Sequence, residues 1–134
     1  MFRPIRLGKD EPTVDLIVFL LDADGDQKGP FFFLQVKATS TGPRPDGTYE
    51  ICFSALDVRR AQAMKVPFFL CVVDRSIPAK RRIYIKGVDS MRKRGIYRLA
   101  PRDDLTSAAV KKALHDEVTR IWAVRCVPCF QKLI

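Results

Sequence analysis

The sequence predicts a single domain, residues 1–134, of the α/β (α+β) class, in which helices flank a mixed central β-sheet. A length of 134 residues is typical of one domain. Apolar residues make up 47% of the chain and charged residues 29%, which excludes a disordered tail and a membrane protein. Strand-like apolar runs are interrupted by helical patterns in the order β-β-β-α-β-β-α, and this order is typical of a mixed sheet.

The first elements are two apolar strands joined by a polar turn. Residues 14–21 read VDLIVFLL and residues 31–39 read FFFLQVKAT, and both runs are rich in residues that suit buried strands. The eight residues at 22–29 between them are dense in Asp and Gly, which form turns. We therefore expect an antiparallel hairpin.

The middle of the chain predicts a strand and a short helix. Residues 40–47 hold two prolines and two glycines and read as an exposed loop. The alternating pattern at 48–53 predicts a third strand. Ser54 is a suitable N-cap for a helix over 55–65.

The second half predicts two more strands and two helices. A buried strand is expected at 66–74, another strand at 82–86, and a short helix near 88–94. A longer packing helix runs from about 105 to 124, capped by Asp104 or Thr106. Its apolar stripe consists of Leu105, Ala109, Ala113, Leu114, Val118, Ile121 and Trp122.

The charge balance favours a polyanion as partner. The chain carries 24 Lys and Arg against 15 Asp and Glu, a net charge of +9. The alternative is that the excess positive charge serves only to keep the protein soluble. Two basic clusters could form one patch that contacts nucleic acid, namely Lys80, Arg81 and Arg82 with Arg92, Lys93 and Arg94.

The cysteines and the N-terminus bear on the cellular compartment. Cys52 and Cys71 lie in apolar strand-like runs and are expected to be free core thiols. Cys126 and Cys129 have CxxC spacing but no second ligand pair, so structural thiols are favoured over a zinc site. No apolar segment follows the basic N-terminus, and a cytoplasmic protein without a membrane anchor is expected.

Three polar residues of the hairpin form the candidate site. Because side chains alternate along a strand, Gln35 and Lys37 share one face, and pairing of the two strands brings Asp15 to the same end. Asp15, Gln35 and the main-chain carbonyl of Val36 could supply oxygen ligands to a divalent metal. Lys37 could orient a water and stabilise negative charge on a phosphate. A buried Asp15–Lys37 salt bridge, with Gln35 as a bystander, is the structural alternative.

The strand pattern resembles that of a nuclease superfamily. Val14-Asp15, a hairpin and then LQVKAT at 34–39 resemble the D…QxK variant of the PD-(D/E)XK (restriction-endonuclease-like) superfamily, as in Mrr-like restriction endonucleases. The nearest match is an uncharacterised bacterial domain family of that superfamily. Its members similarly have a VDL strand, an FFxQVK(A/T)T strand and a later VPxxLxVVD strand, here 66–74.

This resemblance implies a restriction-endonuclease-like core over about 14–86 and a metal-dependent DNA endonuclease that hydrolyses phosphodiester bonds with Mg²⁺ or Mn²⁺. Asp15, Gln35 and Lys37 match the acidic, amide and lysine positions of the family. Nucleases of the superfamily often pair, so a homodimer is a further expectation. The usual N-terminal glutamate has no assigned counterpart, since neither Asp10 nor Glu11 is given that position. The alternative is a catalytically inactive nucleic-acid-binding or protein-interaction module on the same fold.

Three tyrosines complete the set of candidate contacts. Tyr49, Tyr84 and Tyr97 could stack on bases beside the basic clusters, although aromatic residues in strands more often belong to the core.

Overall fold

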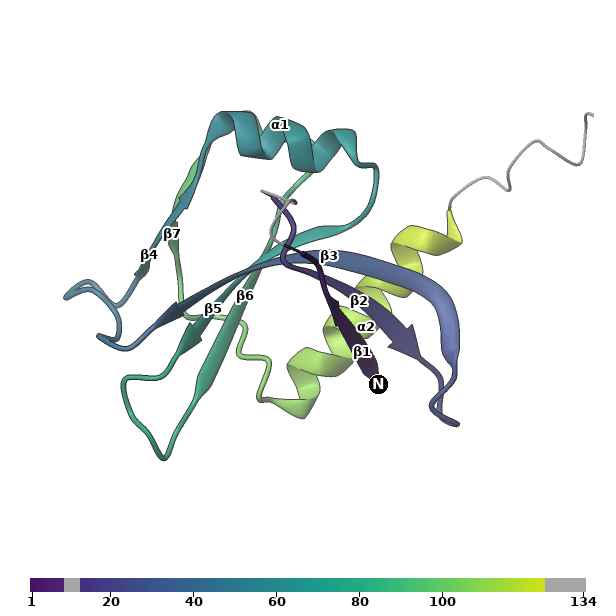
Figure 1. Cartoon of the computed structure of the whole chain (residues 1–134), viewed down its shortest axis with the longest axis horizontal. Coiled ribbons are helices and arrows are strands. Elements are labelled where there is room, and N and C mark those ends of the chain that lie inside the picture. The colour runs from purple at the N-terminus through teal and green to yellow at the C-terminus, as the bar shows by residue number, and fades with distance from the viewer. Residues whose placement is uncertain (9–12, 125–134) are drawn as a thin grey trace, which may run out of the picture.

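The computed structural model describes residues 1–8 and 13–124 and shows an α+β fold (Figure 1). The predicted fold class is confirmed at this level. In chain order the elements are β1 (Phe2–Arg6), β2 (Leu16–Leu21), β3 (Gln27–Thr39), β4 (Tyr49–Phe53), α1 (Ala55–Ala63), β5 (Phe68–Asp74), β6 (Arg82–Gly87), β7 (Ile96–Leu99) and α2 (Ala108–Ala123).

Five strands form a mixed sheet in the order β1-β2-β3-β5-β6. Only β3 and β5 run parallel; the other neighbours are antiparallel. The predicted hairpin is confirmed, since β2 and β3 pair with Leu16 opposite Leu34 and Phe19 opposite Phe31. A parallel pair needs a crossover connection, and the segment that contains β4 and α1 supplies it.

The third predicted strand exists but lies outside the central sheet. β4 pairs with β7 in a separate two-stranded sheet. Its buried residues Tyr49, Ile51 and Phe53 alternate with the exposed Glu50 and Cys52. The alternating pattern predicted the strand correctly, but it carries no information about which strand becomes the partner.

The two faces of the five-stranded sheet have different covers (Figure 1). We call the face under α1, β4 and β7 the site face. Its core joins Phe53 and Val58 to Leu70, Val72 and Ile96. We call the opposite face the α2 face. There the apolar side of α2 packs on residues of four central strands, and the cluster includes Val18, Leu20, Phe32, Leu34, Cys71, Ile85, Leu114 and Val118.

Helix α1 begins after the predicted N-cap and ends two residues before the predicted end at residue 65. The Ser54 Oγ accepts from Asp57 N at 3.1 Å, and an Asp57 carboxylate oxygen accepts from Ser54 N at 2.9 Å, which completes a capping box. The helix ends at Ala63, and Lys65 then adopts a positive φ of 56°. Pro67 disfavours helical geometry in the residue before it, so the chain leaves the helix here.

Three segments differ from the sequence prediction. β1 and β7 were not predicted. β1 contains Pro4, and on an edge strand the missing proline N–H need not cost a ladder hydrogen bond. The short helix expected near 88–94 does not form. Side chains hold this segment as turns instead: Gln62 Nε2 donates to Asp89 O at 3.0 Å and to Arg92 O at 2.7 Å.

Helix α2 begins at Ala108, three residues later than predicted, with Ser107 as N-cap. Residue Leu105, expected inside the helix, instead donates its N–H to Ile83 O of β6. Asp104 accepts from the N–H and hydroxyl of Thr106 at 2.9 and 2.8 Å, in a turn before the helix. Of the predicted apolar stripe, Leu114 and Val118 are buried, whereas Ala109 and Ala113 are exposed.

The predicted core thiols have different outcomes. Cys71 is buried, and burial raises the pKa of its thiol to about 12. Cys52 is exposed, so its assignment to the core was wrong: it occupies an outward position of β4. Cys126 and Cys129 lie outside the described residues. Within 1–8 and 13–124, neither helix has the length and apolar character that a membrane span requires.

Candidate functional site

Asp15 lies immediately before β2 and is held by hydrogen bonds on both sides. Its N–H donates to Leu34 O at 3.0 Å, and its carbonyl accepts from Leu7 N at 2.9 Å. Its side-chain Oδ2 accepts from Val36 N at 2.7 Å. The carboxylate is therefore fixed against β3, at the point where the hairpin ladder ends.

Gln35 and Lys37 lie on the site face of β3. In the parallel ladder Gln35 is opposite Leu70 and Lys37 is opposite Val72, and both partners belong to the core under β4 and α1. Residues directly opposite each other in a sheet point to the same face. Leu34 belongs to the core of the α2 face, as the alternation predicted.

A pocket of about 400 Å³ brings the candidate residues together. Asp15 and the β3 segment form one wall, and β4 forms the opposite wall. The lining consists of Asp15, Gln35, Val36, Lys37, Ala38, Ile51, Cys52, Phe53, Leu70 and Cys71. All three candidate side chains and Val36 thus share one concave site. Sequence reasoning missed Cys52 and Phe53, because the position of β4 over the hairpin cannot be read from local pattern.

The structural alternative of a buried salt bridge was wrong. Asp15 and Lys37 are both exposed, and among the described residues no ion pair joins them. The Asp15 carboxylate instead uses one oxygen to accept the Val36 N–H. The lysine and the carboxylate therefore line the same pocket as separate charges.

The donor set consists of hard oxygen atoms. Asp15, with its carboxylate, and Gln35, with its amide oxygen, line the pocket together with Val36, whose main-chain carbonyl is a further oxygen donor of the segment. Divalent magnesium prefers such ligands and needs only one or two carboxylates when substrate phosphates complete its coordination. Within the described residues no group of three or more His, Cys, Asp or Glu side chains is placed to bind a metal. The pocket therefore fits Mg²⁺ in ligand type, with Asp15 as its one described carboxylate.

A second acidic residue, Asp74, fixes the wall of the pocket. Asp74 is only 5% exposed at the end of β5, and its Oδ2 accepts from Tyr49 Oη of β4 at 2.5 Å. Burial acts to raise the Asp74 pKa, but hydrogen bonds from Ser76 and Tyr49 and the charge of Arg82 outweigh it and hold the pKa below its ordinary value. Burial and the same bond raise the pKa of Tyr49 far above its usual range, so its hydroxyl stays a donor.

The two basic clusters lie at opposite ends of β6. Lys80 and Arg81 lie in the turn between β5 and β6 and Arg82 begins β6, whereas Arg92, Lys93 and Arg94 follow the other end of β6. The six residues of β6 separate the clusters by about 17 Å of extended chain. Arg92 is further tied down, since its guanidinium donates to the carbonyls of Arg94 and Gly95 at 3.0 and 2.9 Å.

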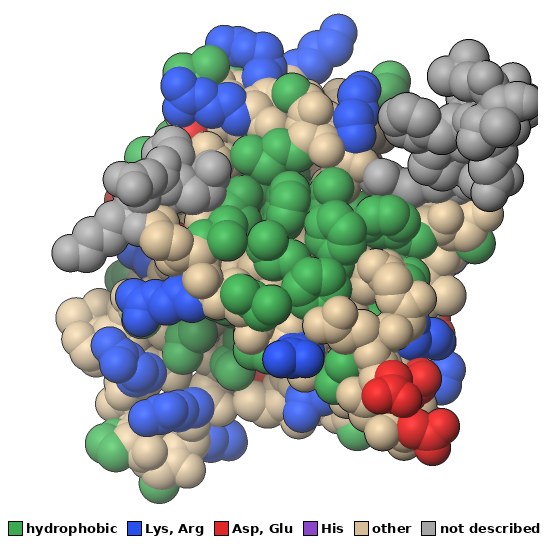
Figure 2. All heavy atoms as spheres, turned by 45° about the vertical axis from the view of Figure 1, so that its right-hand side comes forward, with side chains coloured by type: hydrophobic (Ala, Val, Ile, Leu, Met, Phe, Trp, Pro, Cys, Tyr) green, Lys and Arg blue, Asp and Glu red, His purple; other side chains and the backbone are tan. Residues whose placement is uncertain are grey.

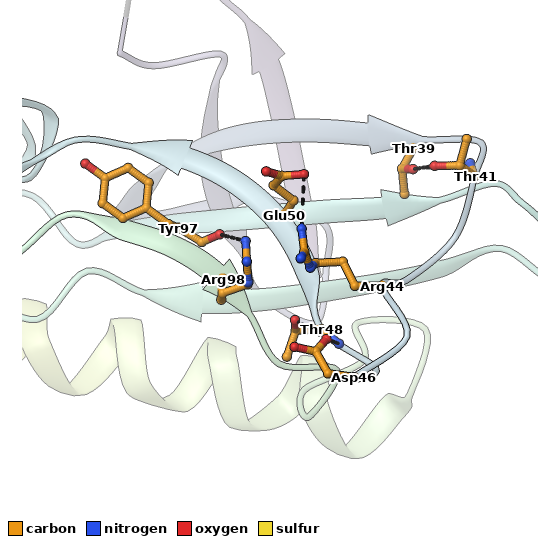
Figure 3. A network of polar contacts seen from close by, with 8 residues as sticks. All are labelled: Thr39, Thr41, Arg44, Asp46, Thr48, Glu50, Tyr97 and Arg98. Atoms are coloured by element: carbon orange, nitrogen blue, oxygen red, sulfur yellow. Dashed lines mark hydrogen bonds and ion pairs between the residues drawn. The ribbon is translucent and has the colours of Figure 1, made fainter.

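The loop between β3 and β4 is held by short-range polar contacts (Figure 3). Asp46 accepts from the N–H and hydroxyl of Thr48 at 3.0 and 2.7 Å, and these bonds lower its pKa with help from the charges of Arg44 and Arg98. Arg44 also lies 3.6 Å from Glu50 of β4. These contacts set the course of the chain from the site strand back to the wall of the pocket.

Comparisons with protein-family models, with curated proteins and with solved structures found no match to this chain.

Proposed function

We propose that the protein is a metal-dependent DNA endonuclease of the PD-(D/E)XK type that hydrolyses phosphodiester bonds. One observation carries the proposal: Asp15, Gln35, Val36 and Lys37 line a single pocket, with the Asp15 carboxylate anchored on the Val36 N–H at 2.7 Å. A restriction-endonuclease-like core is part of the proposal. It agrees with the antiparallel hairpin β2–β3 and the parallel pair β3–β5, which is connected through α1.

Four residues of the pocket have roles in the proposed reaction. Asp15, Gln35 and the Val36 carbonyl would hold Mg²⁺ or Mn²⁺ with oxygen ligands. When bound, the metal would supply Lewis-acid polarisation of the scissile phosphate. The Lys37 ammonium would orient the attacking water and stabilise the negative charge that develops on the phosphate oxygens.

The basic surface would supply affinity for the DNA backbone. The chain has a net charge of +9, and each phosphate neutralised by Lys or Arg releases a counterion. Lys80 and Arg81 are exposed at the β5–β6 turn, and Lys93 and Arg94 are exposed before β7. Because the clusters lie apart, the proposal has the backbone contacted at two places. DNA is the partner in this proposal and the cytoplasm is the expected compartment.

The decisive experiment is a cleavage assay on plasmid and linear DNA with Mg²⁺, Mn²⁺ or EDTA. We expect metal-dependent cutting by the wild-type protein and a loss of at least about 100-fold in Lys37→Ala, because a preorganised charge at the reacting phosphate is removed. Lys111→Ala is the matched control: it removes the same charge from an exposed position of α2 and should cut at the wild-type rate within about twofold. Equal activity in Lys37→Ala and Lys111→Ala would refute the assignment of Lys37.

A second candidate function is a nucleic-acid-binding or protein-interaction module without catalysis. The observation that favours it is the single carboxylate, Asp15, among the described residues that line the pocket. In this case the wild-type protein would shift DNA at low salt, with or without metal, and leave it uncut. A protein-interaction role would remain if the chain neither cut nor bound DNA.

A further inference from the structure

Of the three tyrosines, one is available to a ligand. Tyr49 and Tyr84 are 3% and 7% exposed, and their rings pack together at a centroid distance of 5.4 Å in the site-face core. Tyr97 on β7 is 53% exposed. The sequence could not distinguish these three, but the structure assigns two of them to the core and leaves one at the surface.

Gly95 makes room for the Tyr97 ring. A Cβ atom at Gly95 would lie 2.8 Å from Tyr97 Cε2, 2.8 Å from Tyr97 Oη and 2.8 Å from Phe53 O. The ring thus lies against the main chain of Gly95, and more than half of the residue's surface remains open to solvent. A ring supported in this way loses little conformational freedom when a flat partner stacks on it.

Basic residues lie on both sides of Tyr97 along the chain. Arg94 precedes and Arg98 follows it, and both are exposed; the Arg98 Nη1 donates to Tyr97 O at 3.3 Å (Figure 3). Arg44 lies near the other end of β7, where it and Arg98 both lower the pKa of Asp46. Asp46 and Glu50 offset part of the charge. The exposed residues Arg44, Lys93, Arg94 and Arg98 outnumber these two carboxylates.

This surface adjoins the candidate site. β7 pairs with β4, with Ile96 opposite Phe53 and Arg98 opposite Glu50. Tyr97 is therefore one strand spacing, about 4.8 Å, from the segment of β4 that contains Cys52, and Cys52 lines the pocket with Asp15 and Lys37. Tyr97 and the pocket therefore belong to neighbouring strands.

We propose that Tyr97, Arg98, Arg94 and Arg44 form a platform that holds an unpaired DNA strand, with a base stacked on Tyr97 and phosphates on the arginines. Aromatic side chains between basic residues bind single strands because every unpaired base offers a flat face, whereas a base inside a duplex is already stacked on its neighbours. As far as cleavage is concerned this inference rests on the proposed function, and it names the substrate class as single-stranded or frayed DNA. A pocket of about 400 Å³ lined on both sides suits a separated strand.

Binding measured in EDTA tests the platform without any cleavage. A fluorescein-labelled oligothymidylate and a duplex of the same length are titrated with the full chain and followed by anisotropy. We expect the single strand to bind more tightly than the duplex. Tyr97→Ala should raise the Kd for the single strand by about tenfold or more, and Tyr97→Phe, which keeps the ring, should stay within about twofold. Ile5→Ala, an exposed apolar position on β1, is the control and should leave both affinities unchanged.

The outcomes separate the two proposals. If Tyr97→Ala binds the single strand as the wild type does, or loses the same factor on both DNA forms, the platform is refuted, whatever the cleavage assay shows. If Tyr97→Ala loses only single-strand affinity while Lys37→Ala still cuts DNA, the platform stands and the nuclease assignment fails. Arg98→Ala should lower affinity for the single strand and reduce its dependence on salt concentration, because it removes a phosphate contact.

Discussion

The two faces of the five-stranded sheet are covered in different ways. The α2 face is closed by one helix, and its contacts include Leu114 and Val118 in the core and a 2.8 Å hydrogen bond from Trp122 Nε1 to Phe31 O. The site face is covered by separate pieces, α1 and the β4–β7 ribbon (Figure 1). A pocket there is lined by residues of β3 and β4. A cover made of several elements can leave space where polar side chains reach solvent, whereas a single packed helix excludes them.

A further apolar surface lies where the end of α2 meets the β2–β3 hairpin. Figure 2 shows apolar side chains gathered on one side of the molecule, with basic side chains around them. Phe31 contacts Trp122 at 4.8 Å and Phe19 at 5.6 Å between ring centroids, and all three residues are half-buried. Phe31 alternates with Phe32 of the α2-face core and shares its side of β3 with Phe33, which packs against the site-face core. This apolar surface therefore adjoins the site face, where the pocket presents a carboxylate and a lysine.

The sharpest test of this difference is a substitution in the pocket that preserves packing. Asp15→Asn keeps an oxygen that can accept the Val36 N–H but removes the negative charge. If the protein is the proposed nuclease, we expect DNA cleavage to fall by at least about 100-fold, because the proposed metal ligand loses its charge, while the unfolding free energy changes by less than about 1 kcal/mol. Cleavage rates and urea unfolding of the same preparations would check both. A large loss of stability would show that Asp15 acts mainly in the fold.

On the α2 face a substitution should lower stability strongly and leave DNA binding unchanged. Leu114 is 6% exposed, and Leu114→Ala should lower the unfolding free energy by about 3 kcal/mol through lost burial and the cavity left behind. Binding of DNA per folded molecule should be unchanged. Chemical denaturation and a binding titration at low temperature measure the two quantities. A matched change at exposed Ala113, such as Ala113→Ser, should cost under about 0.5 kcal/mol.

The wall of the pocket gives a pH-dependent prediction. The Asp74 pKa lies below its ordinary value of 3.8, so the ionised carboxylate stabilises the fold above that pH, and this contribution is lost as the pH falls through the lowered pKa. Asp74→Asn should lower the unfolding free energy by about 2 kcal/mol at neutral pH. It should also make stability fall less steeply as the pH is lowered (the acid limb of the profile). Thermal melts from neutral to acidic pH would show it. An unchanged acid limb would contradict the role given to the Tyr49–Asp74 bond.

The smallest effect is expected at the start of α1. Ser54→Ala removes the acceptor of the Asp57 N–H and should cost about 1 kcal/mol. Ser54→Asn retains a capping acceptor and should recover most of that loss. Because α1 covers the site face but does not line the pocket, metal-dependent activity at low temperature should remain. Denaturation midpoints of the two variants measure the difference.

The hairpin and the proximity of Asp15, Gln35 and Lys37 could be predicted because the relevant signals are local. Alternation along residues 31–39 determines the face of Gln35 and Lys37, and a polar turn brings Asp15 beside them. The broad class follows from the order of the elements. The endonuclease assignment, its metal and its DNA partner stay predictions, to be decided by the cleavage assay.

The wall of the site could not be predicted, because it depends on long-range pairing. β7 has four residues and no strong pattern, and it pairs with β4 more than forty residues earlier in the sequence. The same pairing gives Tyr97 its exposed position and separates it from Tyr49 and Tyr84. Asp74 looked like the end of an apolar strand, and its bond to Tyr49 of β4 becomes visible only once the crossover is in place.

The bond from Val36 N to Asp15 Oδ2 also has a consequence for the order of folding. It joins residues 21 positions apart, within one hairpin, so it can form on the microsecond timescale of hairpin closure. The opposite wall forms only when β4 pairs with β7, and this pairing closes a much longer loop. We therefore expect the carboxylate and lysine to be in place in early, open forms of the chain, with the enclosed pocket completed only as β7 docks.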